Sequence, residues 1–365
     1  MVAIARSNRL RRTPFSQGVE EAGVSAYSIY NRMLLPAMFE SLAADCEHLK
    51  QHVQVWDVAC ERQISVKGPD AAKLMALLTP RDLSKMADDQ CYYVPMVDQN
   101  GGMLNDPVAV KHRDDHYWIS IADSDLLLWV KGVAAGMGLN VSVEEPDVSP
   151  LAVQGPKADE LVARVFGDVV RDIRFFRYKR MEFQGRDLVI ARSGYSKQGG
   201  FEIYVDGGNI GMDLWQALFA AGQDLDVRAG GPNLIERIES GLLSYGNDMT
   251  AAHTPFDCGL GKFVNSDADY IGRAALEKSR TKGAKWQLCA LEIFGDPVPT
   301  CDRHWAILMN GERIGQVTSA TYSPDHKINV AIGMVQADRF AAGVDVEVET
   351  QAGRCDARLR AEFWT

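Results

Sequence analysis

The sequence predicts an α+β fold, in which two related units of sheet plus helix precede an all-β domain of β-barrel type. Three observations predict it. First, ISVKGPDAAKLMALLT (64–79) resembles LAVQGPKADELVARVF (151–166), and each copy reads as a short strand, a Gly-Pro turn and an amphipathic helix. Second, strand-rich sequence follows each copy. Third, beyond about residue 270 the chain consists of short strands separated by Gly, Pro and Asp turns.

The individual elements follow from the same patterns. Stretches rich in alternating apolar residues predict strands within residues 91–122, 181–205, 286–295, 313–323, 328–336 and 345–353. Apolar residues at helical spacing predict further helices within residues 123–138, 212–223 and 233–246. We therefore expect a first, discontinuous α+β domain (1–55 plus 143–270), a second α+β domain (56–142) and a C-terminal all-β domain (271–365).

The composition is that of a large folded protein. The 365 residues are 46% hydrophobic, which is enough for a large core and for two or three domains. The formal net charge is −10, the opposite of the balance that is typical of nucleic-acid binding. No apolar run approaches the roughly 18 residues of a membrane span, and the N-terminus lacks the apolar segment of a secretory signal. We expect a cytoplasmic protein that binds neither nucleic acid nor a membrane.

The cysteines and histidines do not indicate a metal site. The seven cysteines form no C-x-x-C pair and are odd in number, so we expect them to be reduced and mostly buried. His112 and His116 lie four residues apart, but they flank a predicted hairpin turn. No G-x-G-x-x-G follows a strand and opens a helix, and no G-x-S-x-G is present. Neither a dinucleotide-binding unit nor a serine hydrolase is indicated.

The stretch ARSGYSKQGGFEIYV (191–205) predicts a hairpin with a long turn. Strand side chains alternate in direction, so Glu202 and Tyr204 share one face and the large apolar residues beside them point into a core. On this pattern alone, the face of Glu202 would be solvated. The turn YSKQGG is longer than a tight hairpin requires, and longer loops more often carry function.

Several motifs together resemble the folate-dependent aminomethyltransferase (glycine cleavage T-protein) family. RSGYSKQGGFEIYV resembles the family segment R-(S/T)-G-(Y/W)-x-x-x-x-G-(F/Y)-E, and QNGGMLNDPVAV resembles GG-(I/V)-x-(D/N)-D. IERIESGLLSYGNDM resembles R-L-E-x-G-x-x-L-Y-G-x-(D/E), and TPFDCGLGKFV resembles T-P-x-E-x-G-L. The order and spacing fit over essentially the whole chain. Each motif alone is weak, but jointly they are specific.

Within this family the chain is most similar to a branch that demethylates the sulfonium compound dimethylsulfoniopropionate. The likeness extends to RLRRTPF, GVSAYSIYNRMLLP, HVQVWDVACERQ, SKQGG and PNLIERIESGLLSYGND. The resemblance implies a three-domain cloverleaf around a central folate channel. It also implies transfer of a methyl group to N5 of the co-substrate tetrahydrofolate, giving methylmercaptopropionate and 5-methyltetrahydrofolate, with neither metal nor flavin.

The resemblance assigns residues to the folate. Glu202 matches the carboxylate that hydrogen-bonds the pterin ring, whose amidine-like edge suits a bidentate acceptor. Arg237 matches an arginine that also faces the folate. Asp106 matches an aspartate beside the reacting nitrogen, where a carboxylate can orient the pterin and receive its proton, which makes Asp106 a catalytic candidate. Phe176 and Val108 are assigned to the same folate site.

The residues themselves leave other interpretations open. Without the motif, Glu202 is a solvated strand residue and Arg237 a helix-surface arginine paired with a neighbouring glutamate. Asp106 is equally a turn residue before Pro107. Among the aromatic residues before the hairpin, Phe175, Phe176 and Tyr178, at least one is expected to pack in the core.

The methyl donor is assigned to Tyr195, Lys197 and Tyr204, and Tyr204 is the second catalytic candidate. A cation without hydrogen-bond donors is best held by aromatic faces. Tyr195 stands where the sulfonium demethylases usually have Trp, whereas aminomethyltransferases usually have Tyr there, packed on folate. The next residues, Ser-Lys-Gln, differ from the acidic aminomethyltransferase loop, and a cationic Lys197 suits an anionic propionate tail. Lys197 as a solvated loop charge, and Tyr204 as a strand residue with its hydroxyl in water, remain open.

Two other functions stay open. One is a folate-dependent methyl or aminomethyl transferase with another donor: glycine betaine, dimethylglycine or a lipoyl-bound aminomethyl group. The other is a folate-binding iron–sulfur assembly factor, a group that carries K-G-C-Y-x-G-Q. The only remotely corresponding cysteine, Cys258, lies in FDCGLGK without the Tyr or Gln. The subunit count is also open, with a homodimer among the expectations.

Overall fold

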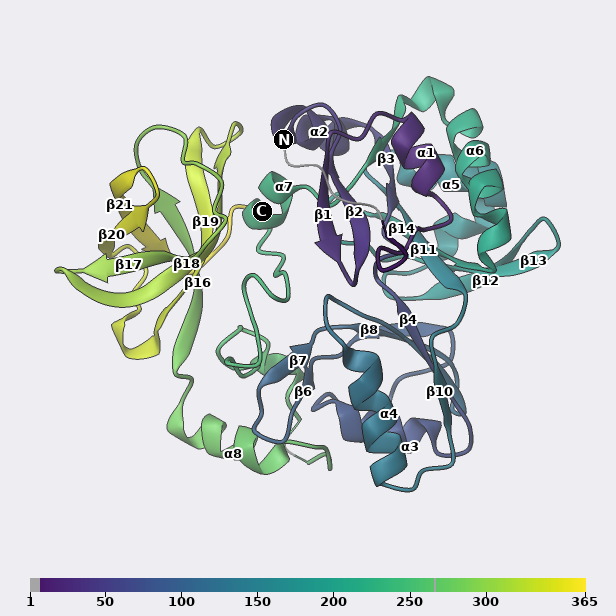
Figure 1. The fold of residues 1–365 in the computed structure, drawn as a ribbon, viewed down its shortest axis with the longest axis horizontal. Coiled ribbons are helices and arrows are strands. Elements are labelled where there is room, and N and C mark those ends of the chain that lie inside the picture. Colours follow the sequence, from purple (N-terminus) through teal and green to yellow (C-terminus); the bar gives the residue numbers. More distant parts are fainter. Residues whose placement is uncertain (1–6, 266) are drawn as a thin grey trace. The chain divides into compact units, whose positions relative to one another are not determined.

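The computed structural model describes residues 7–265 and 267–365. The chain forms two compact units, which are described separately (Figure 1). Unit 1 comprises Met1–Ala71, Met86–Tyr92 and Val108–Asn233, and unit 2 comprises Ala72–Lys85, Tyr93–Pro107 and Leu234–Thr365. The predicted α+β fold class is confirmed, whereas the predicted domain boundaries stay a prediction. None of the helices in the described residues is long and apolar enough to cross a membrane.

Unit 1 contains a six-stranded sheet in the order β12-β13-β14-β11-β3-β15. Neighbouring strands in this sheet pair antiparallel, except that β15 pairs parallel to β3. Its strands are β3 (Val53–Asp57), β11 (Val148–Gln154), β12 (Tyr178–Phe183), β13 (Arg186–Ala191), β14 (Gly200–Asp206) and β15 (Val227–Gly230). The hairpin predicted within 181–205 is therefore present as β13 and β14.

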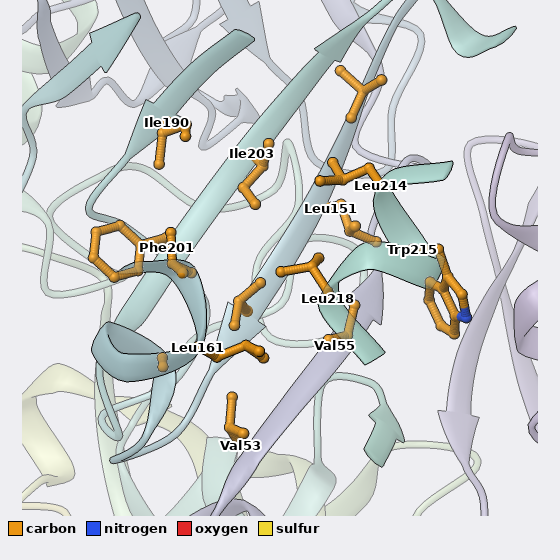
Figure 2. Close-up of a cluster of buried hydrophobic side chains, with 14 of the residues drawn as sticks. Val53, Val55, Leu151, Leu161, Ile190, Phe201, Ile203, Leu214, Trp215 and Leu218 are labelled. Carbon is orange, nitrogen blue, oxygen red and sulfur yellow. The ribbon is translucent and has the colours of Figure 1, made fainter. Parts of the chain in front are cut away.

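Helices α5 (Ala158–Phe166) and α6 (Gly211–Ala221) cover one face of this sheet. Figure 2 shows Phe201 and Ile203 of β14 in one cluster with the helix residues Leu161, Leu214 and Leu218. These side chains are fully buried, so their burial contributes about 1.5–3 kcal/mol each. The helices form because their apolar residues recur three and four apart on the face that meets the sheet.

The opposite face of β14 is buried as well, which corrects the expectation of a solvated face. Tyr204 packs there with Trp118 and Tyr178, and Glu202 is 7% exposed. The cover comes from a second sheet of unit 1, in the order β10-β4-β9-β8-β5. Its strands are β4 (Gln63–Lys67), β5 (Gln90–Tyr93), β8 (Val108–Arg113), β9 (His116–Ser120) and β10 (Ser142–Glu144). Alternation along one strand could not reveal a second sheet packed on its polar side.

The two copies of the sequence repeat have the same local structure. β4 leads through Gly68 into α3 (Ala71–Leu78), and β11 leads through Gly155 into α5. The two glycines have φ of +143° and +120°, a region that favours glycine. A Cβ at Gly68 would lie 2.5 Å from the Asn140 carbonyl oxygen, and one at Gly155 would lie 2.4 Å from that of His52. The shared Gly-Pro turn is thus required by the same close approach of backbone in both copies.

The remaining elements of unit 1 are smaller. They are α1 (Ser16–Glu21), α2 (Leu42–Gln51), α4 (Leu126–Gly136) and the hairpin of β1 (Ala26–Tyr30) and β2 (Met33–Met38). The helix expected within 123–138 is therefore confirmed as α4.

Unit 2 contains a closed barrel in the order β16-β19-β18-β17-β20-β21, as the C-terminal sequence predicted. Its strands are β16 (Trp286–Ile293), β17 (Trp305–Met309), β18 (Glu312–Ser323), β19 (Ile328–Gln336), β20 (Asp345–Thr350) and β21 (Gly353–Arg360). The other elements are α7 (Leu234–Glu239), α8 (Arg273–Lys282) and the short pair β6 (Met96–Val97) and β7 (Met103–Asn105).

The helix predicted within 233–246 is shorter than expected, because α7 ends at Glu239. Gly241 has φ of +66°, and a Cβ there would lie 2.4 Å from the ring of Phe363. The chain leaves the helix here to pass close to the C-terminal segment. The residues after it, up to Asp248, form an irregular turn that becomes important for the site.

Candidate functional site

In unit 1, the central strand β14 places Glu202 in a buried position. Its Oε2 accepts a short hydrogen bond from the Ser193 hydroxyl and a longer one, of 3.5 Å, from Tyr204 Oη. Burial raises the pKa of Glu202 above its usual range. Its Oε1 accepts no hydrogen bond from the residues that the structure describes. A half-satisfied carboxylate is thus held in a largely dry position, which suits recognition of a polar ligand edge.

Tyr204 shares the face of Glu202, as the strand pattern predicted. Its ring is 1% exposed and lies 6.1 Å from that of Trp118, centroid to centroid. Burial raises the pKa of Tyr204 well above its usual range, and the neighbouring charge of Glu202 acts in the same direction. The phenol therefore stays protonated and can donate a hydrogen bond. Its hydroxyl is not in water, so the solvated interpretation of Tyr204 is wrong.

The loop between β13 and β14 is fixed by glycines and by Gln154. A Cβ at Gly194 would lie 2.1 Å from Gln154 Nε2, and one at Gly200 would lie 2.1 Å from the Val153 carbonyl oxygen. Gln154 Nε2 donates to the Ser193 carbonyl at 3.2 Å, and its Oε1 accepts from the Ser196 hydroxyl at 2.7 Å. The glycines are needed so that the loop can pack directly on the end of β11. The sequence motifs did not indicate roles for Gln154 and Ser193, although Gln154 lies in LAVQGP and Ser193 in RSGYSKQGG.

Tyr195 and Lys197 both lie on this tethered loop. Tyr195 is half-buried and Lys197 is exposed. The loop therefore presents one aromatic ring and one cationic side chain close to the carboxylate-bearing strand. Their predicted contact with a methyl donor stays a prediction.

Phe176 has an unusual backbone conformation. Its φ is +58°, which costs energy for a residue with a bulky side chain. Its amide donates to the Arg192 carbonyl and its carbonyl accepts from the Cys91 amide, both at 2.9 Å. These bonds fix the half-buried ring of Phe176 against the cluster that contains Tyr204, and the side chain of Val108 packs against the same cluster. The structure thus brings these two predicted folate residues to the neighbourhood of Glu202's face.

The two aromatic neighbours of Phe176 differ in environment. Phe175 is 71% exposed, and its ring meets that of Phe176 edge-on with centroids 4.6 Å apart. Tyr178 is buried, and its hydroxyl donates to the Lys111 carbonyl at 2.9 Å. Tyr178 is therefore the aromatic residue that packs in the core, as expected for at least one of the three.

In unit 2, Asp106 combines one satisfied and one unsatisfied carboxylate oxygen. Its Oδ2 accepts a hydrogen bond of 2.9 Å from the Tyr93 hydroxyl. Its Oδ1 is buried and has no partner among the described residues. Burial raises the pKa of Asp106 to about 7, although the bond from Tyr93 opposes this, and the negative charge of Asp248 adds to the increase. A carboxyl with this pKa can take up and release a proton near neutral pH.

Arg237 is buried in unit 2, where its guanidinium bonds to several segments of the chain, and it is not a helix-surface residue. Its Nη1 donates to Asp248 Oδ2 at 2.7 Å and to the Leu242 carbonyl at 3.1 Å. Its Nη2 donates to the Ser319 hydroxyl at 2.5 Å. The guanidinium therefore connects α7, the turn after it and barrel strand β18. The alternative interpretation of a helix-surface arginine is wrong, because Arg237 is buried and bonds to Asp248. Contact of Arg237 with folate stays a prediction.

Asp248 was not singled out by sequence analysis as a site residue. It is fully buried, and its Oδ1 accepts from Thr318 at 2.6 Å and from Ser319 at 2.7 Å. Its Oδ2 accepts from the Ser244 amide at 2.8 Å, beside the bond from Arg237. Asp248 does lie in SYGND, part of the motif IERIESGLLSYGNDM, but its partners on the barrel are far away in sequence.

The described residues contain no group of three or more His, Cys, Asp or Glu side chains arranged to hold a metal ion. Five cysteines are buried and two, Cys301 and Cys355, are half-buried. Cys258 is 1% exposed, and burial raises the pKa of its thiol above the usual range. A buried thiol that stays protonated is chemically inert, so Cys258 has the environment of a structural residue.

The chain belongs to the glycine cleavage T-protein family. Residues 16–268 match the family model described as the GCVT N-terminal domain, and residues 287–363 match the glycine cleavage T-protein C-terminal barrel domain. The family prediction from the sequence motifs is therefore confirmed.

Known relatives refine this membership. The chain is 63% identical over 364 residues to dimethylsulfoniopropionate demethylase DmdA of Ruegeria pomeroyi, covering 100% of both chains. It is 30% identical to an aminomethyltransferase of Caldanaerobacter subterraneus, over 86% of this chain and 85% of that one. The structure of aminomethyltransferase T from Bartonella henselae superposes with a TM-score of 0.87 at 23% identity, covering 98% of both chains, and so shares the fold.

Proposed function

We propose that this protein transfers a methyl group from dimethylsulfoniopropionate to N5 of tetrahydrofolate, giving methylmercaptopropionate and 5-methyltetrahydrofolate. The observation that carries this function is the full-length identity of 63% with the demethylase of Ruegeria pomeroyi. The aminomethyltransferase relatives are about half as similar, at 30% identity or below. The motifs that indicated the sulfonium branch therefore agree with the overall similarity.

In this reaction the main task of the protein is to position the reacting groups. A sulfonium methyl carbon is already activated, because the leaving group is a neutral thioether. The N5 lone pair of tetrahydrofolate forms the new bond to carbon, the carbon–sulfur bond breaks, and its electrons remain on sulfur. The protein must hold the three atoms in line and exclude water. Buried side chains such as Glu202 and Tyr204 are suited to a site of that kind.

The two carboxylates have different tasks in this proposal. Glu202 orients the pterin through its unpaired Oε1, because a half-satisfied buried carboxylate gains most from a ligand that donates hydrogen bonds. Asp106 takes the proton that N5 sheds after methylation, since its pKa of about 7 leaves much of it ionised at neutral pH. Arg237, Phe176 and Val108 complete the proposed folate contacts.

Donor recognition rests on the hairpin loop. The ring of Tyr195 offers an electron-rich face to the sulfonium, worth about 0.5–2 kcal/mol. Lys197 offers a positive charge to the propionate carboxylate. The buried hydroxyl of Tyr204 is a donor to substrate or to Glu202. The proposed reaction uses neither a metal nor a flavin. We propose that the enzyme is cytoplasmic and is either a monomer or a homodimer.

Replacing Glu202 by alanine is expected to weaken tetrahydrofolate binding by about 1–3 kcal/mol, because a polar edge of the pterin would lose its partner in a dry site. Titration by calorimetry or fluorescence measures the dissociation constant. Asp206→Asn is the matched control, since Asp206 lies at the exposed end of the same strand. Equal folate affinity in wild type and Glu202→Ala would remove the basis for placing the pterin at Glu202.

Two substitutions of Tyr195 distinguish donor contact from folate contact. If the ring holds the sulfonium, Tyr195→Trp preserves or improves donor binding and Tyr195→Leu weakens it by about 0.5–2 kcal/mol, with folate affinity changed less. If the ring packs on the pterin, Tyr195→Leu weakens folate binding and leaves the affinity for the methyl donor nearly unchanged. Dissociation constants for both ligands and the melting temperature should be measured for the three proteins. We expect the pattern of donor contact. A Tyr195→Leu variant that binds the methyl donor as tightly as wild type would contradict it.

The proposed donor is tested with a panel of methyl donors. The protein is incubated with tetrahydrofolate and, in turn, dimethylsulfoniopropionate, glycine betaine and dimethylglycine, and 5-methyltetrahydrofolate is measured by chromatography. We expect product with the sulfonium and little with either ammonium compound. Product formation from an ammonium donor in preference to the sulfonium would assign the chain to the alternative donor class.

A further inference from the structure

One buried amide side chain in unit 1 connects the strand that carries Glu202 with the loop that precedes it. Gln154 is the last residue of β11 and is fully buried. In the pairing of β11 with β14 it lies opposite Gly200, the position where the hairpin loop returns to the sheet. Its side chain is therefore placed to reach both ends of that loop.

The two ends of the amide bind different parts of the hairpin. Nε2 of Gln154 donates to the Ser193 carbonyl at 3.2 Å, and the Ser193 hydroxyl donates to Oε2 of Glu202. Oε1 of Gln154 accepts from the Ser196 hydroxyl at 2.7 Å. Ser196 stands between the two loop residues that are assigned to the methyl donor. One side chain thus holds both the residue that fixes Glu202 and the segment assigned to the donor.

Only one orientation of the amide makes these bonds. Nε2 lies near three backbone carbonyls, those of Ser193, of Val153 at 3.3 Å and of Phe201 at 3.4 Å. Turning the amide over would direct Oε1 at these carbonyls, none of which can donate a hydrogen bond. The buried oxygens would then lack a partner, which is unfavourable. The orientation that holds Ser193 is therefore also the one that accepts from Ser196.

We propose that Gln154 is a positioning residue for methyl transfer, which keeps Glu202 and the donor loop in register so that folate and the methyl donor meet in line. The inference rests on the proposed function, because it requires that folate contacts Glu202 and that the donor contacts the loop. A displacement of about 1 Å from the reactive geometry can lower a rate by about 10²-fold. A residue that fixes both partners at once should therefore affect the rate of transfer more than the affinity for either ligand.

The test measures the single-turnover rate with both ligands saturating, and the dissociation constants for tetrahydrofolate and dimethylsulfoniopropionate. Gln154→Leu removes both ends of the link and is expected to lower the rate by about 10²-fold. Ser196→Ala removes only the loop end and is expected to lower the rate by about fivefold, the equivalent of one hydrogen bond. Ser196→Thr keeps a hydroxyl and should restore most of the rate. Gln17→Leu is the control, because the exposed side chain of Gln17 bonds to Glu21 of its own helix.

A double variant shows whether the two residues act through their shared bond. In Gln154→Leu/Ser196→Ala the second change is expected to have little further effect on the rate, because the acceptor of the Ser196 hydroxyl is already absent. Fully additive losses would overturn the inference. If Gln154→Leu does not fold, the comparison of Ser196→Ala with Ser196→Thr decides.

The outcomes separate this inference from the proposed function. A Ser196→Ala variant that transfers the methyl group as fast as wild type overturns the inference. A folded Gln154→Leu variant with the rate of wild type and a lowered melting temperature also overturns it, and leaves Gln154 a structural residue. If wild type forms no 5-methyltetrahydrofolate from any methyl donor, the proposed function itself fails.

Discussion

Asp106→Asn is expected to lower single-turnover methyl transfer by about 10²–10⁴-fold, the usual contribution of a positioned proton acceptor. The amide is nearly isosteric and keeps much of the hydrogen bonding, including that from the Tyr93 hydroxyl. It cannot take up the proton that N5 releases. Folate affinity should therefore change much less than the rate. Rapid-mix assays under single-turnover conditions separate the two, and full activity in Asp106→Asn would reduce Asp106 to a turn residue.

The pH dependence provides an independent check on the same residue. Burial raises the pKa of Asp106 to about 7. Below that pH the carboxyl is protonated and cannot accept a proton, so the rate should rise as the pH increases through about 7 and then level off. The rise should be absent in Asp106→Asn. Because the Tyr93 hydroxyl lowers this pKa, Tyr93→Phe should move the midpoint to higher pH. A flat profile for wild type between pH 6 and 8 would exclude this role.

Arg237→Met is expected to destabilise the protein by about 3–5 kcal/mol, because it leaves Asp248 buried and without its cation. Chemical unfolding measures the free energy, and folate titration of the folded variant measures the predicted ligand contact separately. Adding Asp248→Asn should restore part of the stability, since the uncompensated charge is then removed. An exposed pair provides the control: Arg358→Met, which breaks the bond to Asp345, should change the stability little, because solvent screens exposed charges. A loss that small in Arg237→Met would show that Arg237 is not a structural hub.

Local patterns predicted the parts of the fold that depend on neighbouring residues. The Gly-Pro turns of the repeat, the hairpin around Glu202 and the barrel strands all follow from spacing within about 20 residues. The family motifs, and not periodicity, pointed to Glu202 and Asp106. Burial of the Glu202 face was missed, because the second sheet that covers it comes from distant segments of the chain.

The surroundings of Arg237 show the same limit. The sequence offered glutamates on the same helix as partners, whereas the structure adds partners farther along the chain, at Asp248, 11 residues away, and at Ser319, 82 residues away. A buried guanidinium needs several acceptors at once, and only the folded barrel assembles them. Phe176 is similar, since its left-handed backbone is imposed by bonds to Arg192 and Cys91 and has no signature in a run of aromatic residues.

The central claim is direct transfer of a methyl group from the sulfonium to folate N5. Dimethylsulfoniopropionate labelled with ¹³C in its S-methyl groups is incubated with the protein and tetrahydrofolate, and the products are followed by NMR. The proposed function predicts that one labelled methyl appears on N5 for each methylmercaptopropionate formed, and that no donor is consumed when folate is omitted. Consumption of the donor without folate, or label in methanol or formaldehyde and none in 5-methyltetrahydrofolate, would contradict it.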